Sequence, residues 1–325
     1  MQEKPQRFAQ GVIAALLGAT LWGFSGSCAE FLLSSYEISS IFITMVRMLG
    51  ASVLFIGYTM ITQRGVIRRI LSDKRTVGSL LVFGCIGLYL DQITYVIAIG
   101  YTNAGTATVL ANVGLILIML VTCFTARRLP YAGEFLGVIC AFAAVMLIAT
   151  KGDFGTLNLP AEGLFWGMMN AASLALYVMQ PRKLFAQWGS LPITGLGMLF
   201  GGFAAMAVWV VSIVLAVLGI GPQTGDMALG ALMPVLDANG IGMLVVIVVI
   251  GTFAAFGLHL HGVSVVGSMR GGLLGAIEPV SATLFSALWL GTAFTGADWV
   301  GLVLMVITIF LVTIQRGMKT AAAQG

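Results

Sequence analysis

The chain has 325 residues, of which 59% are hydrophobic and only 9% are charged, and its mean hydropathy is +1.03. Soluble domains carry roughly 25% charged residues, so this composition excludes a water-soluble globular protein. The net charge is +4. We attribute the basic excess to topology-determining loops and to contacts with lipid headgroups, and we expect no nucleic-acid partner.

Ten long apolar segments account for most of the chain. A helix needs roughly 20 apolar residues to cross a hydrocarbon core of about 30 Å. Barrel strands alternate apolar and polar residues, whereas these segments are continuously apolar. The sequence therefore predicts an all-α, polytopic membrane protein embedded in a lipid bilayer. Its membrane-spanning helices are expected at 11–33, 38–62, 77–99, 103–124, 131–150, 163–181, 190–219, 240–262, 266–290 and 297–315.

The basic residues predict how these helices are oriented. If the amino terminus is cytoplasmic, 13 of the 16 Lys and Arg residues lie at cytoplasmic helix ends, in cytoplasmic loops or in the cytoplasmic tails. The exceptions are Lys151, in a loop on the opposite side, and Arg47 and Arg270, inside helices. Cytoplasmic loops of membrane proteins are enriched in Lys and Arg. Both termini are therefore predicted to be cytoplasmic, in a multi-pass protein of a bacterial cell membrane.

The ten segments form two sets of five. We expect a first five-helix repeat over 1–150, an extracytoplasmic linker over 151–162, and a second repeat with a short cytoplasmic tail over 163–325. Leu21-Trp22-Gly23 corresponds to Ser173-Leu174-Ala175 in this comparison, and Gly105 to Gly267. Because five is odd, the second repeat is inverted relative to the first, as in many secondary transporters.

Several short motifs occur in a characteristic order: Leu21-Trp22-Gly23, Arg47, Ala104-Gly-Thr-Ala-Thr-Val109, Glu278-Pro279, Leu290-Gly291 and Trp299-Val-Gly301. On these residues the chain resembles the drug/metabolite transporter superfamily, specifically its EamA-type ten-helix branch, over nearly its whole length. It departs from that pattern at Gly114, where a proline is common, and at Ala126-Arg127 and Gly291-Thr292, which replace Gly-Glu. The resemblance implies a ten-helix transporter but selects no substrate, because the superfamily carries amino acids, sugars, nucleotides and drugs.

Four charged residues lie well inside the predicted spans: Arg47, Asp91, Arg270 and Glu278. A charge at the centre of a membrane helix costs about 2.5–3.5 kcal/mol, so it needs a partner, a wet cavity or a function. One interpretation is a pair of structural ion pairs, Arg47–Asp91 and Arg270–Glu278. The other is a polar cavity between the two halves. In such a cavity Arg47 would bind a substrate carboxylate or phosphate. Glu278 would carry a proton, because a low-dielectric site favours the neutral carboxyl group.

Uncharged polar and aromatic side chains extend this candidate site. For Asn112 and Asn170, two roles are open: lining the cavity or hydrogen bonding between helices. The candidates are Trp22, Tyr95, Asn112, Asn170 and Tyr177.

Glycines recur every four residues in the ninth segment, at Gly267, Gly271 and Gly275, and Pro279 follows. Small residues at this spacing allow close helix packing, and proline interrupts helical hydrogen bonding. The two interpretations are a packing face and a hinge that opens the cavity.

Three other acidic residues, Glu30, Glu134 and Asp298, lie near predicted helix ends, where we expect water to reach them. The cysteines and histidines lack metal-ligand spacing, so we expect no metal site. Neither a Walker-type phosphate loop nor a His-Glu-x-x-His motif occurs, and we expect no catalytic residues and no cofactor.

The favoured function is secondary active transport of a small polar metabolite, such as an amino acid or a related compound, by alternating access. Export is one direction that the sequence allows, with coupling to protons or to a counter-substrate. A channel-like facilitator and an intramembrane enzyme are the alternatives. An inverted duplication argues against a channel, and the lack of a catalytic motif argues against an enzyme. The oligomeric state stays open.

The predicted orientation can be tested by cysteine labelling. In a variant without the four native cysteines, single cysteines in 220–239 should react with an impermeant maleimide added outside the cell. Cysteines in 63–76 should react only after the membrane is permeabilised. The reverse pattern would contradict the cytoplasmic location of both termini.

Overall fold

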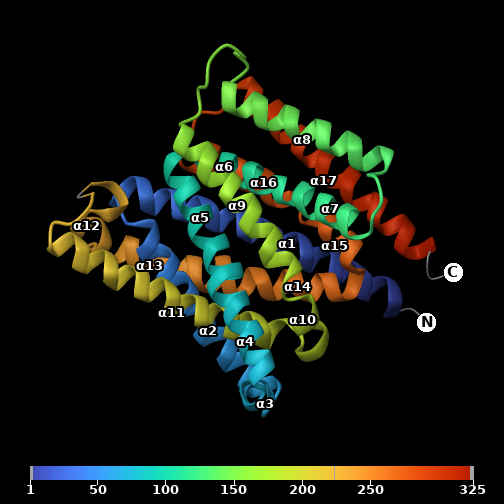
Figure 1. Cartoon of the computed structure of the whole chain (residues 1–325), viewed down its shortest axis with the longest axis horizontal. Helices are drawn as coiled ribbons and strands as arrows, with labels where there is room; N and C mark the ends of the chain where they lie inside the picture. Colours follow the sequence, from blue (N-terminus) through green and yellow to red (C-terminus); the bar gives the residue numbers. More distant parts are fainter. Residues whose placement is uncertain (1–2, 223, 323–325) are drawn as a thin grey trace.

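The computed structural model describes residues 3–222 and 224–322, and within that range it contains helices but no strand (Figure 1). The predicted all-α membrane fold is therefore confirmed. In this described part, nine helices are long and apolar enough to cross a membrane. The sixth predicted segment forms a further helix, α9 (Ala161–Met179), which is not among the nine. Glu162 and Asn170 lower the hydropathy of α9.

Each predicted segment corresponds to a helix or to consecutive helices. The first half contains α1 (Glu3–Tyr36), α2 (Ser40–Thr62), α4 (Lys74–Val82), η1 (Phe83–Leu88), α5 (Tyr89–Tyr101), α6 (Ala104–Ala111), α7 (Val113–Thr125) and α8 (Ala132–Thr150). The second half contains α9, α11 (Ser190–Val217), α13 (Ala238–Val248), η3 (Val249–Ala254), α14 (Ala255–Val266), α15 (Ser268–Leu274), α16 (Ile277–Trp289) and α17 (Gly296–Ala322). Short connecting helices are α3 (Val66–Ser72), α10 (Arg182–Trp188), η2 (Gly225–Met227) and α12 (Leu229–Leu232).

The same backbone irregularities recur in both halves. The third span contains a π-helical segment, η1, and the eighth contains another, η3, each of six residues. The fourth span is interrupted at Asn112, between α6 and α7, and the ninth between Leu274 and Ile277, where α15 gives way to α16. Matching irregularities in matching spans are what a duplicated five-helix unit would produce.

Gly267 lies outside the helix that the sequence predicts from residue 266. It separates α14 from α15 with a φ of +89°, a conformation that costs glycine least. Gly271 lies within α15 and packs against Val263 of α14. The three predicted glycines therefore do not form one continuous helical face.

Contacts between the two halves form the centre of the bundle. Helix α1 packs against α14 and α16, and α9 makes the corresponding contacts with α5, α6 and α7. Helices α2 and α11 pair across the halves, as do α8 and α17. The contact between α1 and α14 is close, because a Cβ atom on Gly18 would lie 2.6 Å from the backbone nitrogen of His259.

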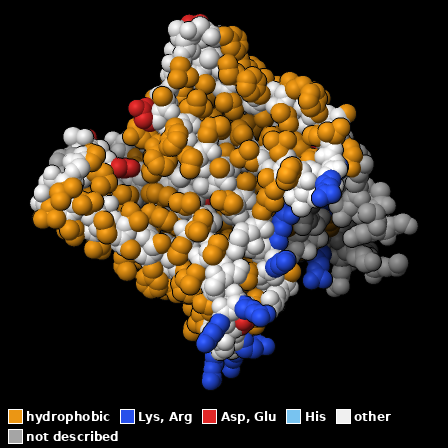
Figure 2. All heavy atoms as spheres, in the orientation of Figure 1, with side chains coloured by type: hydrophobic (Ala, Val, Ile, Leu, Met, Phe, Trp, Pro, Cys, Tyr) orange, Lys and Arg blue, Asp and Glu red, His pale blue; other side chains and the backbone are white. Residues whose placement is uncertain are grey.

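The outside of the bundle is apolar, as a membrane-embedded surface requires. In Figure 2, hydrophobic side chains cover most of the visible face, and Lys and Arg lie at its lower tip, over α3 and α4, and along its right side. Large apolar side chains point outward from many helices, among them Phe142 and Phe165, which are 68% and 57% exposed.

The expectation that water surrounds Glu134 and Asp298 is wrong. Their residues are 0% and 4% exposed, and each is the third residue of its helix. Glu134 accepts hydrogen bonds from the Tyr131 backbone N–H and from both terminal nitrogens of Arg128. Asp298 accepts from the Thr295 backbone N–H and forms an ion pair with Lys151. Both carboxylates accept hydrogen bonds at the start of a helix, where backbone N–H groups have no partner within the helix.

Glu30 is only partly buried, but its carboxylate is also hydrogen-bonded by the protein. Its Oε2 accepts hydrogen bonds from the Ala104 backbone N–H at 2.9 Å and from the Ser286 hydroxyl at 2.6 Å. Its Oε1 accepts from the Thr292 hydroxyl at 2.7 Å. One side chain of α1 therefore connects the start of α6 with α16 and with the turn after it.

We predict that Glu30→Gln lowers the stability of the protein. A glutamine offers one acceptor oxygen instead of two, so at least one of the three donors loses its partner, at a cost of about 2 kcal/mol. Thermal unfolding of the purified protein in detergent measures the effect. Glu37→Gln is the matched control, because Glu37 lies just beyond the end of α1 and is exposed. Equal unfolding temperatures for the two variants would contradict the role given to Glu30.

Candidate functional site

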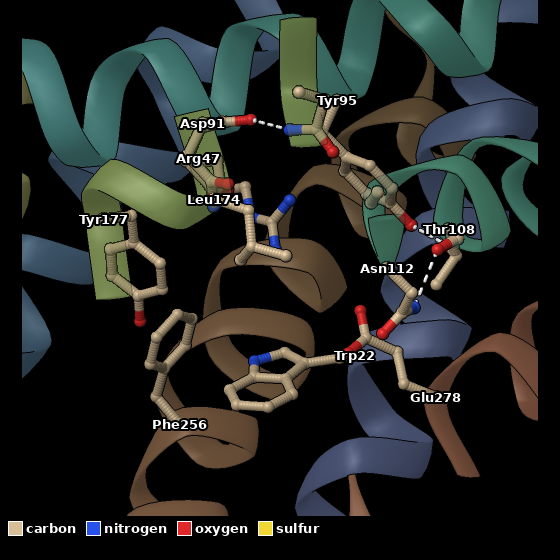
Figure 3. Close-up of a pocket in the computed structure, with 13 residues that line it drawn as sticks. Trp22, Arg47, Asp91, Tyr95, Thr108, Asn112, Leu174, Tyr177, Phe256 and Glu278 are labelled. Carbon is tan, nitrogen blue, oxygen red and sulfur yellow. Dashed lines mark hydrogen bonds between the residues drawn. The ribbon is translucent and has the colours of Figure 1, made fainter. Parts of the chain in front are cut away.

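A cavity of about 120 Å³ lies between the two halves, at the centre of the bundle (Figure 3). It is large enough for a small molecule or several waters, since one water needs roughly 10–15 Å³ on this scale. Its walls come from both repeats. The residues that line it are Trp22, Arg47, Asp91, Gln92, Tyr95, Thr108, Ala111, Asn112, Asn170, Leu174, Tyr177, Phe256 and Glu278.

The cavity brings together eight of the nine residues that the sequence suggests for binding or coupling: Trp22, Arg47, Asp91, Tyr95, Asn112, Asn170, Tyr177 and Glu278. Arg270 is the exception. It is exposed near the start of α1, where its guanidinium carbon lies 4.9 Å from the centre of the Phe8 ring. Arg270 is therefore not part of the cavity and forms no ion pair with Glu278.

Arg47 is held by the second repeat. Its residue is 5% exposed, and its Nε donates a hydrogen bond to the Thr252 hydroxyl at 2.9 Å. Thr252 lies in the π-helical segment η3, and its hydroxyl donates onward to the Ile247 carbonyl at 2.8 Å. The side chain is therefore fixed through one nitrogen, while its two terminal nitrogens make no hydrogen bond within the described residues.

Asp91 follows the other π-helical segment, η1, in the first turn of α5. Its Oδ2 accepts a hydrogen bond from the neighbouring Gln92 amide at 3.2 Å, as Figure 3 shows. The Gln92 Oε1 atom is buried and accepts no hydrogen bond from the described part of the chain. This part of the wall therefore presents acceptor oxygens.

Glu278 lies in the first turn of α16, just after the interruption of the ninth span. Figure 3 shows its carboxyl group among the residues that line the cavity. Neither oxygen accepts a hydrogen bond from a described side chain or backbone group. Pro279, the next residue, is buried in the same first turn, where its missing N–H breaks no helical hydrogen bond.

The three charged groups do not pair directly. Within the described residues the salt bridges are Arg128–Glu134 and Lys151–Asp298, and neither reaches the cavity. Arg47, Asp91 and Glu278 thus line one space without a contact of 4 Å or less between opposite charges. A small ligand could accept from the guanidinium and donate to the carboxylates at the same time.

The two asparagines make different contacts. Asn170 donates from α9 to the Asp91 backbone carbonyl at 2.7 Å and to the Thr94 hydroxyl at 3.2 Å, so it joins α9 to α5. Asn112 instead donates to the Thr108 carbonyl in its own chain segment, at 2.8 Å. It lies at the interruption between α6 and α7.

Aromatic rings form another part of the wall. Trp22 lies with its ring centre 4.8 Å from that of Phe256 and 4.6 Å from that of His259. Its indole N–H is buried and has no acceptor in the described part of the protein. Tyr95 shares a hydrogen bond of 2.7 Å with the Thr108 hydroxyl.

Sequence reasoning leaves out several residues of the site. It does not name as site residues Thr108, Ala111, Leu174 and Phe256, which line the cavity, or Thr252, which accepts a hydrogen bond from Arg47. Leu174 had a detectable signal, because it occupies the position in the second repeat that matches Trp22. Thr108 lies in the motif Ala104–Val109, which carries the family resemblance but assigns this residue no role. Ala111 and Phe256 are apolar residues in apolar helices and have no signal of their own.

We predict that the cavity contains water. In a variant without native cysteines, Leu174→Cys should react with a small water-soluble methanethiosulfonate, because this position lines the cavity. Leu176→Cys is the matched control on the same helix, since Leu176 is 51% exposed on the apolar outside. Thiolate forms only where water reaches it, so equal reactivity of the two variants would contradict a wet cavity.

Comparison with known proteins shows the same organisation. The profile of the EamA-like transporter family matches residues 9–150 and again 161–314. An uncharacterized inner membrane transporter of Salmonella typhimurium, YicL, is 30% identical over 314 residues, which cover 97% of this chain and 98% of that protein. An uncharacterized transporter of Methanothermobacter thermautotrophicus is 22% identical over 222 residues, which cover 66% of this chain and 63% of that protein.

A solved crystal structure with 18% sequence identity shares the fold. The TM-score is 0.60, and the match covers 96% of this chain and 98% of the other. The family profile and the full-length relative together show that this chain belongs to the EamA-like transporter family and is a multi-pass membrane transporter.

Proposed function

We propose that this protein is a secondary active transporter that moves a small polar metabolite through the central cavity by alternating access. The observation that carries the proposal is the set of three charged side chains, Arg47, Asp91 and Glu278, which line one cavity between two repeats without pairing. Buried charges are expensive in a membrane and are retained where they bind a substrate or an ion.

The chemistry of the walls supports an amino acid or a related zwitterion as the substrate. The terminal nitrogens of Arg47 suit a carboxylate, because a guanidinium binds such a group through two parallel hydrogen bonds. Asp91 and the free acceptor oxygen of Gln92 suit an ammonium group. Trp22 and Phe256 suit the apolar part of such a molecule.

Glu278 is the proposed site of proton coupling. Its carboxyl group lines the cavity but is fixed by no hydrogen bond or salt bridge from the described residues. Its charge can therefore change without breaking a structural contact. Exchange against a counter-substrate is the other coupling that the cavity would support.

The interrupted spans are the proposed hinges. Helix α16, which carries Glu278, begins after a break that contains Gly275, and Gly267 and Gly271 lie on the preceding segment. Interrupted helices near the bilayer midplane form the binding sites of many transporters with inverted repeats. We place the protein in the cell membrane with both termini in the cytoplasm, as the distribution of basic residues suggests.

Counterflow in proteoliposomes tests the transport proposal. Vesicles loaded with one unlabelled amino acid at a time should accumulate the same amino acid in labelled form, and the accumulation should saturate. A carrier alternates between two faces and shows counterflow, whereas a channel or an enzyme does not. Absence of counterflow across a panel of amino acids would contradict the proposed substrate class.

We predict that Glu278→Gln separates binding from coupling. The amide cannot exchange a proton, so accumulation driven by a pH gradient should be lost, while counterflow at equal pH should persist. Arg47→Ala should reduce both activities, because it removes the proposed carboxylate ligand. Glu162→Gln is the control, since Glu162 is exposed at the start of α9. Normal pH-driven accumulation by Glu278→Gln would contradict the role of this residue.

A further inference from the structure

A second depression lies away from the central cavity, where α2 ends and α3 begins. It measures about 620 Å³ and is lined by residues of a single stretch, from Met60 to Ser72. Its apolar wall includes Met60, which is 58% exposed, and Leu71, which is 46% exposed. Its polar wall includes Arg64 and Arg68. We call this depression the α2–α3 groove.

The arginines of the groove have no acidic partner. The stretch 63–76 contains five basic residues and one acidic residue, Asp73. The Asp73 carboxylate accepts hydrogen bonds from the Thr76 hydroxyl at 2.6 Å and from the Arg75 backbone N–H at 3.1 Å, and so caps α4. No salt bridge of the described chain involves Arg64 or Arg68. Two guanidinium groups therefore share one groove with their positive charge uncompensated.

The groove is continuous with the apolar outside of the bundle. The last turn of α2 exposes Met60 and Ile61, the latter at 78%, and Met60 also forms the groove wall. Helix α2 is a membrane span that ends at Thr62, so the groove lies at the edge of the membrane. Figure 2 shows Lys and Arg side chains gathered over α3 and α4, next to the hydrophobic surface.

We propose that the α2–α3 groove binds one anionic phospholipid, with its phosphate between Arg64 and Arg68 and its acyl chains along Met60 and Leu71. An arginine pair favours phosphate, for which guanidinium groups offer matching donors. A free phosphate would leave the apolar wall exposed to water. A neutral phospholipid would leave the arginine charge uncompensated. Only an anionic lipid matches both walls and the place of the groove at the membrane edge.

This binding would act on the part of the chain that leads to the central cavity. Helix α2 carries Arg47, which lies 13 residues before Met60 at the start of the groove, on the same continuous helix. A lipid held at the end of α2 would therefore oppose fraying of that helix and restrain the α2–α4 connection. The inference concerns a site separate from the transport cavity and does not depend on the proposed substrate.

Native mass spectrometry of the purified full-length protein tests the proposal. The protein in a neutral detergent is titrated with phosphatidylglycerol or with phosphatidylcholine of the same acyl chains. We expect one phosphatidylglycerol to bind preferentially to the wild-type chain. Arg64→Gln combined with Arg68→Gln should raise its dissociation constant about 30-fold, since each basic residue near an anionic lipid contributes about 1 kcal/mol.

The matched control is Arg182→Gln combined with Lys183→Gln, a second exposed basic pair outside the groove. This control should leave the dissociation constant within about twofold of the wild-type value. Both double variants alter exposed side chains, and equal thermal unfolding without added lipid confirms that they fold. Met60→Ser combined with Leu71→Ser should weaken phosphatidylglycerol binding as well, because it removes the apolar wall.

Three results would overturn the proposal. One is equal binding of phosphatidylglycerol and phosphatidylcholine. Another is unchanged binding in the Arg64 and Arg68 double variant. The third is displacement of the lipid by an equal concentration of glycerol phosphate, which would reduce the groove to a site for a free anion.

Discussion

The need of every buried polar group for a partner governs this structure, because the hydrocarbon around it offers none. Most buried polar groups find a hydrogen-bond partner within the protein. Glu30, Glu134 and Asp298 each accept several hydrogen bonds, and they do so where helices begin and donors are in excess. Against this background the central cavity gathers several polar groups that the described residues leave unsatisfied. They are the two terminal nitrogens of Arg47, the Glu278 carboxyl group, the Trp22 indole N–H and the Gln92 amide oxygen.

The irregular backbone explains how those groups reach one place. Thr252, which orients Arg47, lies inside one π-helical segment, and Asp91 lies just beyond the other. Glu278 follows the interruption of its own span. Such departures from α-helical geometry are tolerated in a membrane only where protein or a cavity surrounds them. Asp91 and Glu278 therefore follow local breaks in helical regularity, whereas Arg47 lies in the regular helix α2 and is hydrogen-bonded by a residue inside such a break.

The sequence was sufficient for the coarse fold and for most of the cavity residues. Length and hydropathy define the spans, and a charge inside a span is rare enough to single out Arg47, Asp91 and Glu278. The same criterion failed for Arg270, because it lies where α15 begins and the side chain leaves the bundle. For Glu30 the sequence predicted contact with water, and it missed the hydrogen bonds that the residue makes within the protein. Glu30 lies close to a predicted helix end, but its partners Ala104, Ser286 and Thr292 are brought to it only by the fold.

Other features could not be read from composition at all. A π-helical segment has the same apolar residues as the α-helix around it, so η1 and η3 leave no mark in hydropathy. A π-helical turn contains one residue more than an α-helical turn. This additional residue changes the direction in which the following side chains point. This is why Phe256 escaped notice, although it lies four residues after Thr252.

The two π-helical segments also affect which side chains of each span face the cavity. One extra residue in a turn can pass along a helix or be absorbed, and each such step turns the following side chains by about 100° relative to the preceding ones. In the third span the side chains beyond the segment include Asp91, and in the eighth they include Phe256. Each span thus has, next to the cavity, a short segment whose winding determines which side chains face the cavity wall.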